Sequence, residues 1–161
     1  MSGLKAQKAV ITDYIEENQT ALYRLAFAYV RNAEAAMDIV QDAIVQAITH
    51  ASSLKSAEQV KPWLYRILVN ESLLYLRRNK RWIVVEEPPE SGDSDEPDWA
   101  SHMDVLDALD TLEPTLKTII ILRFFEDMRL EDIARVTHAN INTVKSRLYK
   151  ALAQLRMQLD T

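Results

Sequence analysis

The sequence predicts an all-α protein, made of two small helical domains joined by a flexible acidic linker. Apolar residues recur at spacings of three and four in several stretches, which is the period of an amphipathic helix. The 161 residues include only two glycines, and glycine is a residue that weakens helix interiors. No stretch shows the alternation typical of a half-buried strand. Residues 82–103 hold seven acidic and no basic residues, so they divide the chain into two parts.

The net charge of −5 is unevenly distributed along the chain. Residues 1–81 carry 11 basic and 8 acidic residues, whereas residues 104–161 carry 8 basic and 9 acidic ones. Most of the excess acidity therefore lies in the linker. Because a polyanion responds to the local patch it meets, the acidic total does not exclude nucleic acid as a partner.

Several classes of protein are not expected. The chain has no cysteine, so it has neither a disulfide nor a thiolate metal site, which fits a reducing cytosol. Its first residues lack the apolar core of a signal peptide, and no window approaches 18 apolar residues. The acidic stretch from Glu86 to Asp98 does not have the spacing of a calcium loop. We expect a cytoplasmic protein that does not insert into the membrane and needs neither a metal nor a cofactor.

Residues 4–32 predict a first helical region, and a second helix follows from Ala33 to Thr49. This second helix carries an apolar stripe and a separate polar cluster. The expected buried stripe is Met37, Val40, Ile44 and Ala47. The polar cluster is Asp38, Gln41 and Asp42. Composition alone indicates no more than a solvated face for this cluster.

A longer helix is predicted after the polar connection of residues 51–61, because Pro62 suits a first helical turn. Leu64, Ile67 and Leu68 would face inward. The opposite polar face combines cations, an amide and an aromatic ring, namely Arg66, Asn70, Arg77, Arg81 and, at its edge, Trp63. Aromatic rings beside cations suit unpaired bases and their phosphates. The alternative is that Trp63 belongs to the core and that the basic run from Arg77 to Arg81 is a frayed helix end.

The last region begins near Asp104 with two short helices, the second opened by Pro114. A short amphipathic helix around Leu130–Ala134 and a longer one over Asn140–Leu155 are then separated by three residues. This arrangement is typical of a helix-turn-helix. The inner stripe of the longer helix is expected to be Val144, Leu148, Ala151, Leu152 and Leu155.

The outer face of this longer helix carries hydrogen-bonding and cationic groups. They are Asn142, Thr143, Ser146, Tyr149 and Lys150, flanked by Lys145 and Arg147. Five basic residues and no acidic one occur from Arg135 to Arg156. Double-helical DNA is therefore the expected partner, although a lone basic helix is more often an ordinary solvated surface.

Three stretches together resemble the extracytoplasmic-function group of bacterial sigma factors, the smallest members of the sigma-70 family. MDIVQD (Met37 to Asp42) is similar to the family's DLVQE element. WLYRILVNESLLYLRR (Trp63 to Arg78) is similar to its WLYRIARNLALDYLRR stretch. LEDIARVTHANINTVKSRLYKAL is similar to its C-terminal helix-turn-helix. The three occur in the family's order on either side of a linker.

The resemblance implies a σ2 domain at 4–81, a linker at 82–103 and a σ4 domain at 104–159. It implies that the chain directs core RNA polymerase to promoters and helps to open the −10 region. The positions that match the grip on the polymerase β′ clamp helices are Asp38, Gln41 and Asp42; the β flap is the other expected polymerase contact. An anti-sigma factor, often membrane-bound in this family, is a further implied partner.

The DNA-binding positions follow from the same resemblance. Asn70 matches a residue that captures a flipped base of the −10 element, and the loop from Leu54 to Gln59 matches the one that receives it. The full −10 set is Lys55, Trp63, Arg66, Asn70, Arg77, Arg78 and Arg81. The −35 set is Arg123, Asn142, Thr143, Lys145, Ser146, Arg147, Tyr149 and Lys150.

Two positions depart from the family pattern. The usual glycine of the turn is His138, so a residue with a side chain must take the turn conformation, which histidine tolerates better than most. The residue before the first helix of the pair, usually a Ser or Thr cap, is Arg129. Both changes bear on the angle at which the second helix would enter a groove.

Two other classes of function fit the sequence less well. An autonomous helix-turn-helix regulator would leave the Trp63–Arg81 stretch and the Asp38–Asp42 cluster without a role. An enzyme is disfavoured because the histidines, His50, His102 and His138, are far apart and no phosphate-binding loop or nucleophile elbow is present. We therefore expect no catalytic residue.

Overall fold

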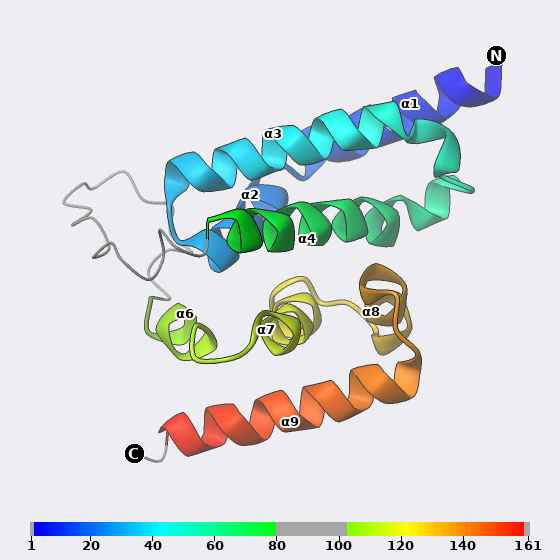
Figure 1. Cartoon of the computed structure of the whole chain (residues 1–161). Helices are drawn as coiled ribbons and strands as arrows, with labels where there is room; N and C mark the ends of the chain where they lie inside the picture. Colours follow the sequence, from blue (N-terminus) through cyan, green and yellow to red (C-terminus); the bar gives the residue numbers. More distant parts are fainter. Residues whose placement is uncertain (1, 80–102, 160–161) are drawn as a thin grey trace.

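The computed structural model describes residues 2–79 and 103–159, and within these residues it contains helices and no strand (Figure 1). The first stretch forms α1 (Ser2–Glu17), α2 (Gln19–Val30), α3 (Ala33–Thr49), 3₁₀ turns at Ala51–Ser53 and Ala57–Gln59, and α4 (Val60–Arg78). The second forms α6 (Met103–Leu109), α7 (Pro114–Ile120), a π-helical turn (Ile121–Phe125), α8 (Leu130–Thr137) and α9 (Ile141–Leu159). None of the described helices is long and apolar enough to cross a membrane. The acidic stretch Glu86–Asp98 and Arg81 lie outside the described residues.

The boundary between α2 and α3 is set by two adjacent residues. Arg31 adopts the left-handed conformation (φ 53°), and its backbone N–H donates to the Phe27 carbonyl, which ends α2. Asn32 then caps α3, because its side-chain oxygen accepts a hydrogen bond from the Ala35 N–H at 2.8 Å. Such caps satisfy backbone donors that the first helical turn leaves free. The break therefore lies where the sequence predicts it.

The helix-turn-helix also forms, and it contains both residues that depart from the family pattern, His138 in its turn and Arg129 before its first helix. His138 takes the left-handed conformation (φ 57°) in place of the family's glycine, and its backbone N–H donates to the Ala134 carbonyl. Asn140 accepts from the Thr143 N–H at 2.8 Å at the start of α9. Arg129 provides no side-chain cap for α8. Its guanidinium instead lies 3.5 Å from Asp132 in the first turn of that helix.

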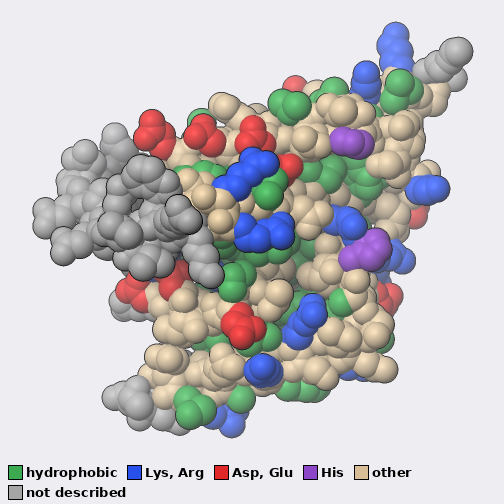
Figure 2. Space-filling view, viewed as in Figure 1, with side chains coloured by type: hydrophobic (Ala, Val, Ile, Leu, Met, Phe, Trp, Pro, Cys, Tyr) green, Lys and Arg blue, Asp and Glu red, His purple; other side chains and the backbone are tan. Residues whose placement is uncertain are grey.

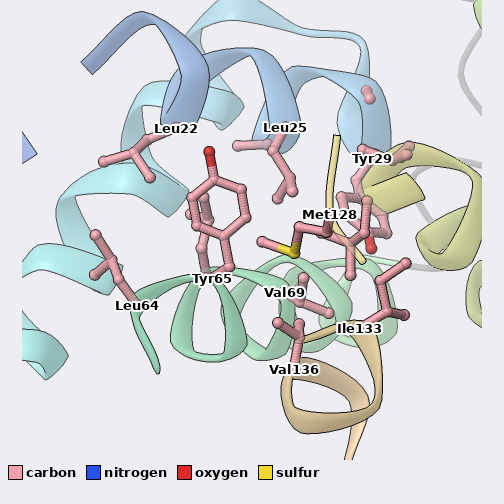
Figure 3. Packing of buried hydrophobic residues seen from close by; sticks show 14 of the residues in the cluster. Leu22, Leu25, Tyr29, Leu64, Tyr65, Val69, Met128, Ile133 and Val136 are labelled. Atoms are coloured by element: carbon pink, nitrogen blue, oxygen red, sulfur yellow. The ribbon is translucent and has the colours of Figure 1, made fainter. Parts of the chain in front are cut away.

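The helices of the two stretches pack into one continuous core. In Figure 1, α2, α3 and α4 form one layer, α7 and α8 lie on its α4 side, and α9 lies beyond α7 and α8. Val69 on α4 lies beside Ile133 and Val136 on α8, the Tyr65 ring points toward Leu25 on α2, and Met128 lies between them (Figure 3). The all-helical fold is confirmed. The packing of the two halves against each other is a feature that the sequence does not reveal.

Two expected core residues are exposed. Met37 is 52% exposed, because α3 packs through a face of small side chains that include Ala36, Ala43 and Ala47. These alanines bring α3 close to its neighbours and turn Met37 outward, while Val40 and Ile44 remain partly buried. On α9, Leu152 is 37% exposed, whereas Val144, Leu148 and Ala151 are buried and pack the helix against its domain. The predicted stripes were wrong at these two positions.

Candidate polymerase and nucleic-acid interfaces

The exposed face of α3 holds the predicted polymerase-binding cluster. Asp38, Gln41 and Asp42 are all exposed and line a cavity of about 400 Å³ between α3 and the end of α4. Met37 and Val45 share this face, because the five side chains lie within about 140° around the helix axis. Val45 is 61% exposed. Apolar side chains among carboxylates and an amide are a composition that suits a protein partner.

Sequence reasoning missed Met37 and Val45 as members of this face. The signal that could have found them is the run of alanines on the other side of α3, which indicates where a helix packs most closely. One expected −10 residue, Arg78, lies in this region. Arg78 lines the same cavity as Asp38 and Asp42, with Glu71 and Tyr75, and does not line the groove beside Asn70.

The predicted single-strand-binding face of α4 forms one wall of a groove of about 870 Å³. Asn70 is exposed at this wall, and Arg66 and Trp63 are partly exposed. The Trp63 ring is fixed by a hydrogen bond from its Nε1 to Ser53 Oγ at 3.0 Å. Figure 2 shows Lys and Arg side chains gathered across this side of the molecule, with acidic side chains along α3 above them. The face therefore offers an amide, an indole ring and positive charge together.

The loop expected to receive a flipped base lies beside this groove without lining it. Ser53 lines the groove, but residues 54–59 do not. Leu54 is buried, and its carbonyl accepts a hydrogen bond from the α1 side chain of Gln7 at 2.6 Å. Lys55 and Arg77 are exposed. Gln7 is a positioning residue that motif matching could not identify, because it lies 47 residues away in the sequence.

The recognition helix α9 presents most of the predicted −35 residues to solvent. The exposed members are Asn142, Lys145, Ser146, Tyr149 and Lys150. Thr143 and Arg147 are partly buried. Arg123 belongs to the π-helical turn and not to α9, and its Nη1 donates to the Met128 carbonyl at 3.2 Å.

The opposite wall of the α4 groove comes from the helix-turn-helix itself. Ala134, Arg135, His138 and Ala139 line it. The Arg66 guanidinium donates to His138 Nδ1, and the Arg135 guanidinium donates to Gln59 Oε1. The structure thus brings the candidate −10 face into contact with α8, the first helix of the helix-turn-helix, and with the turn that follows it.

A buried carboxylate lies at the centre of this contact. Glu126 follows the π-helical turn and is only 5% exposed. Arg24 donates to both of its carboxylate oxygens, at 2.9 and 3.2 Å, and the Tyr65 hydroxyl donates at 3.3 Å. Burial raises the pKa of Glu126 above its ordinary value, and the Arg24 guanidinium opposes this only in part. Burial beside this carboxylate also raises the pKa of Tyr65.

Comparison with known proteins identifies both halves of the chain. The model of Sigma-70 region 2 matches residues 14–82, and that of Sigma-70, region 4 matches residues 102–155. The chain is 42% identical to RNA polymerase sigma factor SigV of Bacillus subtilis (strain 168), over 99% of this chain and 96% of that relative. It is 32% identical to the ECF RNA polymerase sigma-E factor of Haemophilus influenzae, over 76% of this chain and 74% of that relative.

A solved structure has the same fold. The sigma factor RpoE in complex with the anti-sigma factor NepR, from Bartonella quintana, is similar with a TM-score of 0.68 and 26% identity. The match covers 92% of this chain and 98% of that one.

Proposed function

Because the chain belongs to the sigma-70 family of RNA polymerase sigma factors, we propose that it works as a specificity subunit without catalysis of its own. In this role it directs core RNA polymerase to particular promoters and helps to open the −10 region. One observation carries the DNA-binding part of this proposal. The helix-turn-helix exposes amide, hydroxyl and cationic groups on α9, with no carboxylate from Arg135 to Arg156.

We assign these binding functions to two units joined by a linker. Residues 4–81 form the unit that binds core polymerase and the −10 element, residues 82–103 form the linker, and residues 104–159 form the unit that binds the −35 element. The family models cover most of each unit.

The α3 face is the proposed contact with the β′ clamp helices. Asp38 and Asp42 supply negative charge, and Gln41 can both donate and accept hydrogen bonds. Met37 and Val45 add apolar area between them, because both side chains are more than half exposed. Interfaces concentrate their energy in a few central side chains surrounded by less important contacts, and Gln41 lies at the middle of this face. The β flap is the proposed contact of the region 4 unit.

The α4 face is the proposed −10 surface. Holding separated strands requires compensation for unstacking, which costs a few kcal/mol per base. Stacking on an aromatic side chain returns about 1–3 kcal/mol per base, and Trp63 offers such a ring. Asn70 is the exposed amide on this face, so it is the group suited to recognise a flipped base. Arg66 and Arg77 neutralise the backbone, with Lys55 in the neighbouring loop.

The α9 face is the proposed −35 surface. A helix enters the major groove when its outer side chains can reach base edges and its flanks can reach phosphates. Ser146 and Lys150 are exposed at the centre of this face. Lys145 and Arg147 flank them as phosphate contacts.

We also propose an anti-sigma factor as a partner, since a similar sigma factor of known structure is bound to one. If that factor is membrane-bound, it holds this chain at the cytoplasmic side of the membrane without any insertion by the chain itself. No described helix could span a bilayer.

The proposed function is tested by transcription in a defined mixture. Purified core polymerase is given the chain and a library of randomised promoter fragments, and the 5′ ends of the transcripts are sequenced. We expect starts at a fixed distance downstream of one shared pair of sequence elements. Core polymerase alone is the control and should show no such pair. Specific duplex binding by the chain alone, with no transcripts gained on adding core, would instead indicate an autonomous regulator.

A further inference from the structure

We propose that Gln7 on α1 and Ser53, in the 3₁₀ turn that precedes α4, are positioning residues for −10 recognition. Gln7 fixes the chain on either side of Ser53, and the Ser53 hydroxyl holds the Trp63 indole in the orientation from which it stacks on a separated base. This inference rests on the proposed function, because it concerns the ring to which stacking has been assigned. It extends the −10 unit to α1, where none of the expected −10 residues lies.

The Trp63 ring needs a hold beyond its packing, because it is only partly buried. The side chain packs against the core and also lines the groove beside Asn70. Its Nε1 donates to Ser53 Oγ at 3.0 Å. An indole N–H is a donor and offers no acceptor, so this bond turns the nitrogen edge of the ring toward Ser53 and restricts rotation of the side chain.

The Ser53 hydroxyl is committed by two hydrogen bonds. It donates its one proton to the His50 carbonyl at 2.8 Å, which leaves its oxygen free to accept from Trp63. The Ser53 backbone N–H also donates to the His50 carbonyl, at 2.9 Å. Ser53 is exposed, so burial does not hold its hydroxyl in place. The backbone of the turn sets the position of this hydroxyl.

That backbone is held from α1, which packs against the turn. Gln7 Nε2 donates to the Ser52 carbonyl at 3.2 Å and to the Leu54 carbonyl at 2.6 Å. These are the carbonyls on either side of Ser53, and the two bonds use both hydrogens of the amide. Leu54 is 2% exposed, whereas residues 55–58 are exposed. Gln7 thus holds the chain at the point where the exposed part of the loop begins.

Such a relay favours binding by ordering the site in advance. A side chain that is already fixed loses little freedom when its ligand arrives. The same hold positions Lys55, the next residue of the loop and a proposed −10 contact. Neither Gln7 nor Ser53 belongs to the proposed polymerase or −35 surfaces. Changing either residue should therefore weaken −10 binding and leave the other two contacts intact.

The emission of Trp63 tests whether the relay fixes the ring. The tryptophans of the chain are Trp63, Trp82 and Trp99, so Trp82→Phe with Trp99→Phe leaves Trp63 as the only tryptophan emitter. In this background Ser53→Ala should lower the fluorescence anisotropy, because the ring loses its hydrogen bond. Gln7→Met keeps the length of the side chain without its amide, and should lower the anisotropy as well.

Two controls accompany this measurement. Ser53→Thr keeps the hydroxyl and should retain the anisotropy of the parent. Gln19→Met makes the same change as Gln7→Met at an exposed position of α2, and should also have no effect. Circular dichroism checks that the helices of each variant persist. An unchanged anisotropy in both Ser53→Ala and Gln7→Met overturns the inference.

Binding of holoenzyme to premelted templates tests the consequence for −10 recognition. Ser53→Ala and Gln7→Met should each weaken the affinity about three- to ten-fold, which is part of the loss that one stacked base accounts for. Trp63→Ala gives the full loss for comparison. Ser53→Thr should restore the affinity. The affinities for core polymerase and for −35 duplex should match those of the parent, which a general loss of structure would not allow.

The outcomes separate the relay from the proposed function. If Trp63→Ala weakens binding to premelted templates while Ser53→Ala and Gln7→Met do not, the positioning is overturned and the proposed function stands. If Trp63→Ala binds these templates as well as the parent, stacking on Trp63 is wrong, and the inference falls with that part of the proposed function. A loss in Ser53→Ala that Ser53→Thr does not restore overturns the role of the hydroxyl.

Discussion

Arg24 on α2 donates to both carboxylate oxygens of Glu126, at 2.9 and 3.2 Å, across the contact between the two halves of the chain. The two residues are 102 positions apart in the sequence. Glu126 is almost fully buried, while the Arg24 side chain remains 30% exposed. The pair therefore joins the two halves of the chain through one buried carboxylate.

This burial should make the stability of the fold sensitive to pH. Desolvation raises the pKa of Glu126 above its ordinary value of 4.5, so the folded chain holds the proton more tightly than the unfolded chain, in which the carboxylate is solvated. The resulting stabilisation is fully present below the ordinary pKa and is lost as the pH rises through the raised one. Glu126 should therefore stabilise the folded parent as the pH is lowered into that window.

The measurement is the midpoint of thermal unfolding as a function of pH, in the parent and in Glu126→Gln. Other carboxylates titrate equally in both proteins, so the difference between the two curves isolates Glu126. A difference of the opposite sign, with the parent losing stability relative to the variant as the pH falls, would contradict the assignment.

The −35 surface predicts a loss on charge reversal in α9. Lys150→Glu should weaken promoter binding by about 1–3 kcal/mol if Lys150 reads a base. Lys5→Glu on α1 is a matched control, because it makes the same charge change at an exposed site far from the helix-turn-helix. The readout is holoenzyme binding to promoter duplex over a range of salt concentrations. Equal affinities for both variants at every salt concentration would remove Lys150 from the interface.

The polymerase surface predicts effects on α3 that leave the fold intact. Asp38→Arg and Gln41→Ala should weaken binding to core polymerase, and Met37→Ser should do so as well, because its exposed side chain loses apolar contact area. Glu17→Arg, at an exposed position of α1, is the control for charge. Competition for core against a labelled parent measures the affinities, and circular dichroism checks the helices. Variants that compete as well as the parent would place the polymerase contact elsewhere.

The −10 surface predicts a separation of duplex opening from binding. Asn70→Ala should leave binding to core and to −35 duplex near normal, since Asn70 lies on neither surface. It should reduce promoter opening and the discrimination among −10 sequences. Permanganate reactivity of holoenzyme on a duplex promoter gives the first quantity, and affinities for premelted templates with different −10 sequences give the second. If promoter opening and discrimination among −10 sequences by Asn70→Ala both match those of the parent, the α4 face only neutralises phosphates.

Much of this molecule could be predicted from local pattern. Helical periodicity and capping chemistry predict the boundary between α2 and α3 at Arg31 and Asn32. They also predict the helix-turn-helix and the exposed groups of α9. The predicted buried stripe of α3 was wrong at Met37, because the face of α3 that packs most closely consists of alanines. Alanine is only weakly apolar, so a pattern of periodic apolar residues gives it little weight. The sequence groups Arg78 with Arg77, yet adjacent side chains on a helix are rotated by about 100°, and Arg78 lines the cavity beside Asp42.

The contact between the two halves of the chain could not be predicted in this way. Glu126 lies in an ordinary charged segment, FEDMR, where a carboxylate is normally solvated. Its burial depends on the π-helical turn before it, where the Glu126 N–H donates to the Ile121 carbonyl, and on the positive φ of Asp127 after it. It also depends on partners that lie more than 60 residues away in the sequence. No local pattern carries that information.

The central claim, that one chain places polymerase by reading two elements at once, is tested most directly by footprinting a single promoter. Holoenzyme containing this chain should protect the −35 element from nuclease and make thymines of the −10 element reactive to permanganate on the same DNA. Core polymerase alone and the chain alone should do neither. Protection of duplex by the chain alone, with no reactive thymines after core is added, would contradict the account.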